Sequence, residues 1–112
     1  MLSTVQCPDI VMASVQNSPS YDVLKVLGDA EQMLIIAPAS MEAGTIEVSW
    51  DNSTWTTFQI PVGVTMTDVA YPAASKAGQY PVPIAPWMRL HATAGATGAT
   101  RTLKVFKKVW TT

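Results

Sequence analysis

The chain has 112 residues, and only 15 of them are charged: seven basic and eight acidic, with a formal net charge of −1. Charged residues make up 13% of the chain, against about 25% in a typical soluble domain, while 48% of the residues are apolar. The length suits a single domain, and the balance of charge leaves no positive surplus for binding nucleic acid.

The low charge predicts a surface that a partner covers, because charges normally keep soluble proteins apart. Eight prolines, six glycines and many Thr, Val and Ala residues disfavour a helical bundle and favour β-structure. The single cysteine, Cys7, cannot form an internal disulfide, so stability must come from packing or assembly. The longest strongly apolar stretch is residues 33–37, and residues 1–9 lack a signal-peptide pattern. We therefore expect neither a membrane span nor an export signal.

Residues 1–20 are expected to form an N-terminal arm, followed by a single β-sandwich domain over residues 21–112. The arm contains prolines and several serines and threonines around a short apolar stretch, Ile10 to Val15, with room for one strand. Its apolar residues are candidates for contact with a partner. These candidates are Ile10, Val11 and Met12.

Residues 21–37 predict a hairpin of two short strands. Tyr21 to Leu27 is β-branched and apolar, Gly28-Asp29 supplies a turn, and Glu31 to Ala37 resumes an extended chain. A helix over residues 22–36 is the alternative, because several apolar residues there fit helical spacing, but Gly28 interrupts it. The pair of strands is preferred.

Thr45 to Ile60 is the clearest predicted hairpin. Ile46, Val48 and Trp50 alternate with polar residues, which is the period of a half-buried strand and places Trp50 in the core or an interface. The polar cluster at residues 51–54 then reverses the chain, because Asp and Asn side chains bond the backbone two residues on. Residues 55–60 return as the partner strand.

A short strand near Gly63 to Ala70 and an irregular loop are expected within residues 61–79. Trp87 to Ala92 and Arg101 to Trp110 predict a terminal hairpin, joined by a small-residue loop over residues 93–100. Seven or eight such strands, with turn signals every 8 to 12 residues, predict an all-β fold. The expected architecture is an antiparallel β-sandwich or a small jelly-roll-like barrel.

Both terminal strands alternate, which assigns their residues to faces. Trp87, Arg89 and His91 share one face of the first strand. On the second strand, Leu103, Val105 and Val109 share a face, with Lys107 the exception. Phe106 and Trp110 lie on the opposite face, and Trp110 is a candidate interface anchor.

The sequence offers little for catalysis. His91 is the single histidine, so no catalytic triad can be assembled, and its strand position favours a surface or interface role. Cys7 and His91 are too far apart in sequence for a zinc motif, and no Gly-rich loop carries the lysine of a phosphate site. A paired-carboxylate site stays open, although solvated turn and edge carboxylates account for the scattered acidic residues. We expect no enzymatic activity, no cofactor and no metal.

Four tryptophans raise a carbohydrate-binding alternative, because aromatic rings stack on sugars. In that case Trp55, Trp87 and Tyr80 would line a groove. The segment from Ser49 to Trp55 also resembles the Asp-box hairpin of sialidases and other β-propellers, although it is one residue shorter and carries Ser53 in place of glycine. The Asp-box is a structural turn, so this resemblance implies a hairpin and no activity.

Two segments together resemble small β-sandwich virion proteins of tailed bacteriophages. Ile46 to Trp55 is similar to a V-x-V-S-x-D-x-G-x-x-W hairpin, although the usual glycine of its turn is missing. Trp87 to Leu90 and Arg101 to Val105 are similar to a Φ-R-Φ strand followed by an R-T-Φ-x-Φ strand. Residues 1–20 match nothing in this pattern. In such a hairpin, Arg89 and Arg101 would face each other.

The resemblance implies a capsid decoration, or cement, protein that binds the major capsid protein on the head shell. It implies a small homo-oligomer, such as a trimer, located on the capsid surface of the virion and made in the host cytoplasm, with no nucleic-acid or membrane partner. A neck, tail or baseplate protein is the alternative within virions, and a carbohydrate-binding module is the alternative outside them. The interface candidates are Ile10, Val11, Met12, Trp87, Arg89, Arg101, Phe106 and Trp110.

Overall fold

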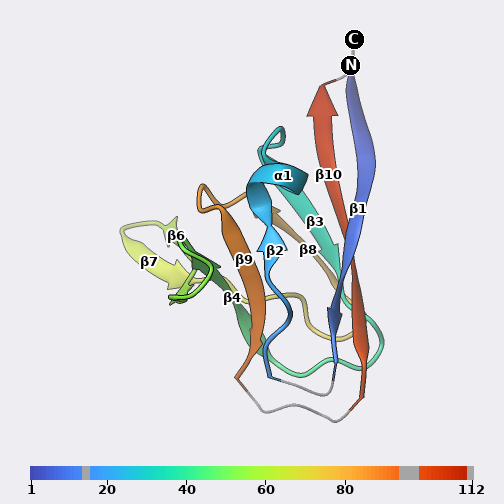
Figure 1. Cartoon of the computed structure of the whole chain (residues 1–112), viewed down its shortest axis with the longest axis vertical. Helices are drawn as coiled ribbons and strands as arrows, with labels where there is room; N and C mark the ends of the chain where they lie inside the picture. The colour runs from blue at the N-terminus through green and yellow to red at the C-terminus, as the bar shows by residue number, and fades with distance from the viewer. Residues whose placement is uncertain (14–15, 94–98, 111–112) are drawn as a thin grey trace.

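Two four-stranded antiparallel sheets face each other in the computed structural model of the chain, which describes residues 1–13, 16–93 and 99–110 (Figure 1). Sheet A contains, in spatial order, β1 (Leu2–Met12), β10 (Arg101–Trp110), β3 (Gln32–Ile36) and β8 (Ala77–Pro81). Sheet B contains β2 (Tyr21–Asp22), β9 (Trp87–Ala92), β4 (Gly44–Ser49) and β5 (Thr56–Thr57). The strands β6 (Gln59–Val62) and β7 (Thr65–Asp68) form a separate ribbon.

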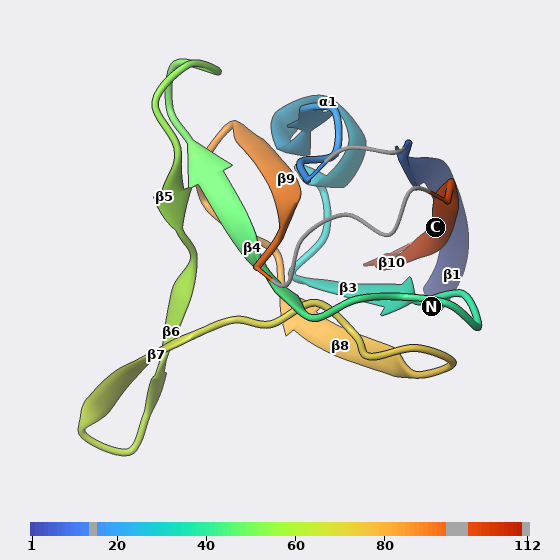
Figure 2. The same cartoon turned by 90° about the horizontal axis from the view of Figure 1, so that it is seen from below.

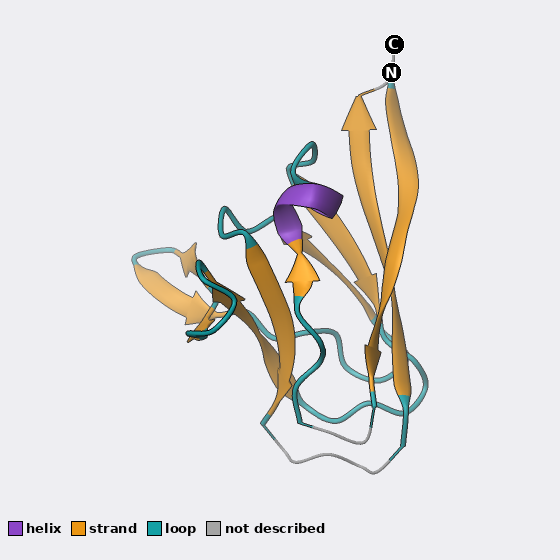
Figure 3. Cartoon of the chain, viewed as in Figure 1, coloured by secondary structure: helices purple, strands orange, loops and turns teal. Residues whose placement is uncertain are grey.

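The predicted all-β sandwich is confirmed, with ten strands among the described residues rather than seven or eight. Figure 3 shows how strands dominate the fold, with α1 (Val23–Leu27) the one helix in the described part of the chain. The additional strands include β8, whose first residues the sequence assigned to the loop within residues 61–79, because glycines and prolines such as Gly78 weaken the apolar pattern there.

The core lies between the sheets and is built by alternation. On β9, Met88, Leu90 and Ala92 point inward, and on β10 Leu103 and Val105 do the same. Each fully buried aliphatic side chain contributes roughly 1.5–3 kcal/mol to the free energy of folding. The other strands and α1 supply the rest of the core. Its further members include Cys7, Ile10, Met12, Tyr21, Val23, Leu27, Met33, Ile35, Ile46, Val69 and Tyr71.

Residues 2–12 are a strand of sheet A rather than an arm outside the domain. β1 pairs with β10 from Leu2↔Trp110 to Met12↔Arg101, so the ends of the two strands lie side by side (Figure 1). The pairing is interrupted by a bulge, where Pro8 and Asp9 stand opposite one residue of β10. Prolines are tolerated in edge strands and at bulges, so Pro8 marked an irregularity within the strand and not its absence.

The predicted hairpin over residues 21–37 is wrong. Residues 23–27 form α1, because Asp22 caps its first turn by accepting a hydrogen bond from the Lys25 backbone N at 2.9 Å. Val23 and Leu27 are four residues apart, so both enter the core from one helix face. β2 and β3 then lie in opposite sheets, and α1 carries the chain between them near one end of the sandwich (Figure 1).

The predicted terminal hairpin is also wrong, although its two strands have the predicted bounds. β9 belongs to sheet B and β10 to sheet A, so Arg89 and Arg101 do not face each other. A turn signal marks a change of direction, and it does not distinguish a hairpin from a connection that crosses between sheets. Within the predicted loop, residues 94–98 lie outside the described part of the chain.

The hairpin predicted over residues 45–60 is confirmed in a shorter form. β4 pairs with β5 through Glu47↔Thr57 and Val48↔Thr56, and the chain then continues into the β6–β7 ribbon. Trp50 is not in the core, because β4 ends at Ser49 and the next residue enters the turn with its side chain 66% exposed. β7 falls within the strand predicted near residues 63–70.

Candidate interaction surfaces

The outer face of sheet B carries a paired polar and aromatic cluster. Arg89 Nε donates a hydrogen bond to Glu47 Oε1 at 2.7 Å, across the β4–β9 register, and its guanidinium lies 4.4 Å from the ring centroid of Trp55. His91 Nδ1 lies 2.6 Å from Asn17 Oδ1. Trp87, Arg89 and His91 share the outer face, as predicted. The polar groups of this cluster are occupied by contacts within the chain, which stabilise the sheet.

A buried ion pair joins the start of β10 to the segment before β4. Arg101 Nη2 lies 2.6 Å from Glu42 Oε1, with 1% and 5% of their side chains exposed. Arg101 Nη1 also donates to the backbone oxygens of Ala13 and Ala99. The hydroxyl of Tyr71 is buried beside this pair, and burial together with the Glu42 charge raises its pKa to about 12. Among the described residues this hydroxyl has no hydrogen-bond partner.

Asp51 organises the turn that the sequence likens to an Asp-box. Its Oδ1 accepts hydrogen bonds from the backbone N of Thr54 at 2.7 Å and of Ser53 at 2.9 Å, and from Ser49 Oγ at 2.9 Å. These bonds, led by the one from Thr54, lower the pKa of the Asp51 carboxyl to about 2. The left-handed backbone of Asn52, at φ 60°, completes the reversal. The carboxylate therefore acts as a structural clamp.

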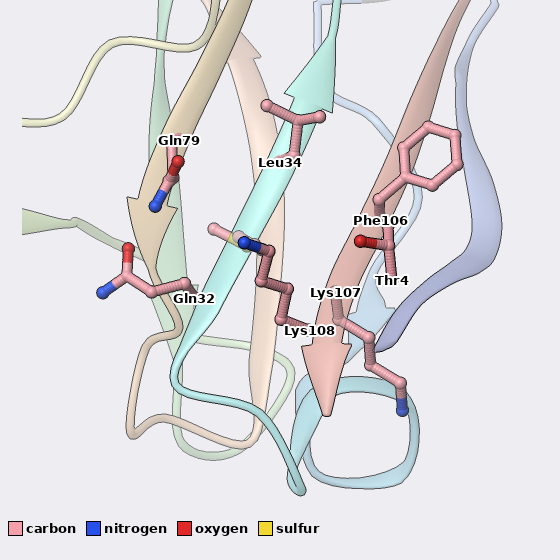
Figure 4. A pocket seen from close by; sticks show the side chains of 8 residues that line it. Thr4, Gln32, Leu34, Gln79, Phe106, Lys107 and Lys108 are labelled. Atoms are coloured by element: carbon pink, nitrogen blue, oxygen red, sulfur yellow. The ribbon is translucent and has the colours of Figure 1, made fainter. Parts of the chain in front are cut away.

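The outer face of sheet A has a shallow hollow across its central strands (Figure 4). Phe106 and Leu34 are register partners on β10 and β3, and Gln79 and Thr4 flank them from β8 and β1. The volume is about 110 Å³, well below the roughly 300–1,000 Å³ of small-molecule sites. Such a hollow suits one side chain of a protein partner better than a metabolite.

Lys107 borders the hollow. Its contacts explain why a charged residue stands at a position of β10 where the alternation predicts an apolar one. By alternation its position falls on the face of β10 that carries Leu103 and Val105, and its ammonium reaches the end of α1. There Nζ donates to the Val26 backbone oxygen at 2.6 Å and to Asp29 Oδ1 at 2.7 Å. A long lysine stem can thus sit on an apolar face while its charge reaches polar partners at the rim.

The ends of β1 and β10 extend this outer face with exposed apolar side chains. Leu2 is 49% exposed and its register partner Trp110 is 77% exposed. A second hollow of about 430 Å³ adjoins the first and shares Lys108, with Leu2 and Trp110 in its lining. We call Leu2, Thr4, Phe106, Lys108 and Trp110 the terminal surface. There an exposed aromatic side chain, Trp110, and a hollow lie together on a sheet face.

The eight interface candidates from the sequence fall in different places. Ile10, Met12 and Arg101 are buried in the chain's own sandwich, which corrects their assignment to a partner contact. The error came from treating β1 as a free arm and the start of β10 as a hairpin edge. Phe106 and Trp110 lie on the terminal surface, Val11 is exposed on the edge strand, and Trp87 and Arg89 are half-buried on sheet B.

The aromatic groove considered for a sugar does not form. Tyr80 lies on β8 of sheet A and packs against the core, where burial raises its pKa to about 12. Trp87 lies in sheet B, and Trp55 contacts Arg89 of that sheet. The ring of Tyr80 therefore packs toward the core from sheet A, whereas Trp55 and Trp87 belong to the side of sheet B.

Other exposed apolar residues went unpredicted. They lie on the β6–β7 ribbon, on α1 and before β9, and the sequence predicted no exposed apolar surface in these segments. The residues are Leu24, Val62, Val64, Met66 and Ile84. The sequence feature that could have predicted their exposure is the presence of glycines and prolines nearby. That feature is not specific, because it also occurs beside buried strands.

The described residues contain neither a metal-ligand group nor a membrane-spanning helix. Across residues 1–13, 16–93 and 99–110, no three His, Cys, Asp or Glu side chains group as metal ligands would. No helix in these ranges has the length and apolarity to cross a membrane. Comparisons with known protein families, curated proteins and solved structures find no match.

Proposed function

We propose that this chain is a structural virion protein that coats the head shell of a tailed bacteriophage as a capsid decoration, or cement, protein. The observation that carries the proposal is the terminal surface, where Trp110 and Leu2 stand exposed beside a hollow on a sheet face. Contiguous exposed apolar patches mark binding sites in soluble proteins. The low charge of the chain and the two phage-like strand motifs support the same role.

The terminal surface binds the major capsid protein in this proposal. Trp110 is the anchor, because a large aromatic side chain buried at the centre of an interface contributes most to affinity. Lys108, on the same face, lies at the rim, where a charge affects association rate and salt dependence more than affinity. Binding only to the assembled shell stabilises that shell by mass action, by about 2.7 kcal/mol at a free concentration of roughly 100 times Kd.

The proposal is tested by cosedimentation of the purified chain with mature head shells that lack it. Saturation at the number of repeating units of the capsid lattice is the expected result. Saturation at a few copies per particle would contradict the decoration role and favour a neck, tail or baseplate position. Absence of binding would overturn the decoration role, and a screen of sugars by tryptophan fluorescence would then test whether an exposed tryptophan binds carbohydrate outside the predicted groove.

A further inference from the structure

The two sheets have four edges, and three of them are short. β8 has five residues and ends at Pro81, while β2 and β5 have two residues each. Short strands and prolines at an edge discourage a further strand from pairing there. β1 is the fourth edge, and its 11 residues make it the longest strand in the described part of the chain.

The first half of β1 lacks the usual protection of an edge strand. Residues 2–6 carry no charge, and the proline and the bulge lie further along, at Pro8 and Asp9. Thr4, Val5 and Gln6 are all exposed, so both faces of this half of the strand are accessible. It pairs with β10 on one side, and no other described strand lies beside it on the other (Figure 1).

This edge offers backbone N–H and C=O groups to a partner. In an antiparallel pair, alternate residues direct both groups away from the neighbouring strand. Within the described chain, the backbone of residues 4–6 forms hydrogen bonds to no segment other than β10. The protein partner that matches such groups is another extended strand, which adds to the sheet at its edge.

A second copy of the chain supplies a strand with matching chemistry. When β1 pairs antiparallel with its own copy, residues 2–6 meet residues 2–6, and no like charges are opposed because none of them is charged. The contact is closed by a two-fold axis, and the joined sheet then ends at two short β8 edges. We propose that β1 pairs with β1 of a second copy and joins the two copies of sheet A into one continuous sheet.

A register centred on Thr4 keeps this contact within residues 2–6. It places Thr4 opposite Thr4, and Thr–Thr pairs across strands are favourable. A register centred on Val5 would bring in Pro8, which has no backbone N–H to donate to a ladder. In the Thr4 register the other opposed residues are Leu2 with Gln6 and Ser3 with Val5.

The two-fold axis stands perpendicular to the joined sheet, so the outer faces of both copies of sheet A lie on one side. Both terminal surfaces then point the same way, and the pair can bind a shell at two places at once. The β6–β7 ribbon lies on the side of the molecule opposite β1 in both views (Figures 1 and 2), so it stays clear of this contact. The binding of two shell sites rests on the proposed function, whereas the strand pairing does not.

Disulfide trapping tests the pairing directly. T4C sets two thiols opposite each other at the axis, where the Cβ atoms of opposed residues come close to the separation found in a disulfide. T102C is the matched control, because Thr102 is also exposed on the outer face of sheet A but lies on β10, one strand in from the edge. Under mild oxidation we expect T4C to form a covalent dimer several-fold faster than T102C. Wild type is the blank, since Cys7 is buried. Equal rates for the two variants would overturn the inference.

Charge substitutions at the same position give an independent test by sedimentation velocity. T4K alone and T4E alone each oppose like charges across the axis, so each should be monomeric at concentrations where wild type is a dimer. An equimolar mixture should regain the dimer, because a lysine then faces a glutamate. Thr4 is exposed, so thermal unfolding should change little. A monomeric or trimeric wild type, or a mixture that stays monomeric, would overturn the inference.

The two proposals fail separately. Wild type that coats shells, combined with equal trapping rates for T4C and T102C, would overturn the strand pairing and leave the decoration role standing. A dimer that is trapped through T4C, combined with no shell binding by wild type, would overturn the decoration role and leave the strand pairing standing.

Discussion

Arg101 should contribute strongly to stability, because its guanidinium is buried and paired with the Glu42 carboxylate. Replacing Arg101 by Met leaves Glu42 buried without its cation, which typically costs about 3–5 kcal/mol of unfolding free energy. Urea unfolding followed by tryptophan fluorescence measures this loss. The double variant R101M/E42L should recover most of it, since a buried ion pair can be replaced by apolar residues. Equal losses in the single and double variants would contradict the ion-pair account.

The labelling rate of the Cys7 thiol tests whether β1 belongs to the sandwich in solution. Burial raises the pKa of its thiol, and the side chain is 6% exposed on the inner face of β1. Because the thiolate is the reactive form, a thiol-specific reagent should label native protein slowly and urea-unfolded protein quickly. Fast labelling of the native chain would mean that residues 2–12 detach from β10, as an arm would.

At the scale of the element, the Asp51 turn predicts a local response to acid. Its carboxyl has a pKa of about 2 in the fold, against an ordinary value of 3.8. Because the folded pKa is the lower one, the turn is stabilised at pH values above 3.8, and this contribution is lost as the pH falls toward 2. Amide resonances of Ser53 and Thr54 should titrate with a midpoint near 2 in NMR spectra. An ordinary midpoint, or the same titration in D51A, would contradict the clamp.

The α1 segment shows why element type was hard to predict. Residues 21–27 have strand-forming composition, yet Asp22 caps a helical turn, and both Val23 and Leu27 reach the core between the sheets. The free energy gained by burying two side chains and capping the helix outweighs a preference for strand that spans only about 1 kcal/mol. A short helix also connects opposite sheets, which a hairpin does not.

At the scale of the whole molecule, a substitution of Trp110 should weaken binding to the shell without weakening the fold. W110S removes an exposed side chain, so the unfolding free energy should change by no more than about 0.5 kcal/mol. Shell affinity should fall by at least about tenfold, because an interface anchor typically contributes more than 1.4 kcal/mol. W50S is the matched control, because Trp50 is also exposed but lies after β4 of sheet B. Equal affinity of W110S and wild type in cosedimentation would exclude the terminal surface as the docking site.

The sequence by itself determined local features of this chain. The bounds and faces of β9 and β10 follow from period-2 alternation, and the turn at Asp51 follows from the short polar side chains that favour it. The outward positions of Phe106 and Trp110 on β10 were predicted for the same reason. Alternation is a property of adjacent residues, so it needs no knowledge of which strands pair.

Only the tertiary structure decided which strands share a sheet. It placed β9 and β10 in opposite layers, brought Glu42 to Arg101, and buried Ile10 and Met12. It also left the β6–β7 ribbon exposed and placed β1 at the edge of sheet A. These features depend on contacts between residues far apart in sequence, whose free energies are shared across the whole core. No local pattern encodes them, which is why the strands could be predicted and their assembly could not.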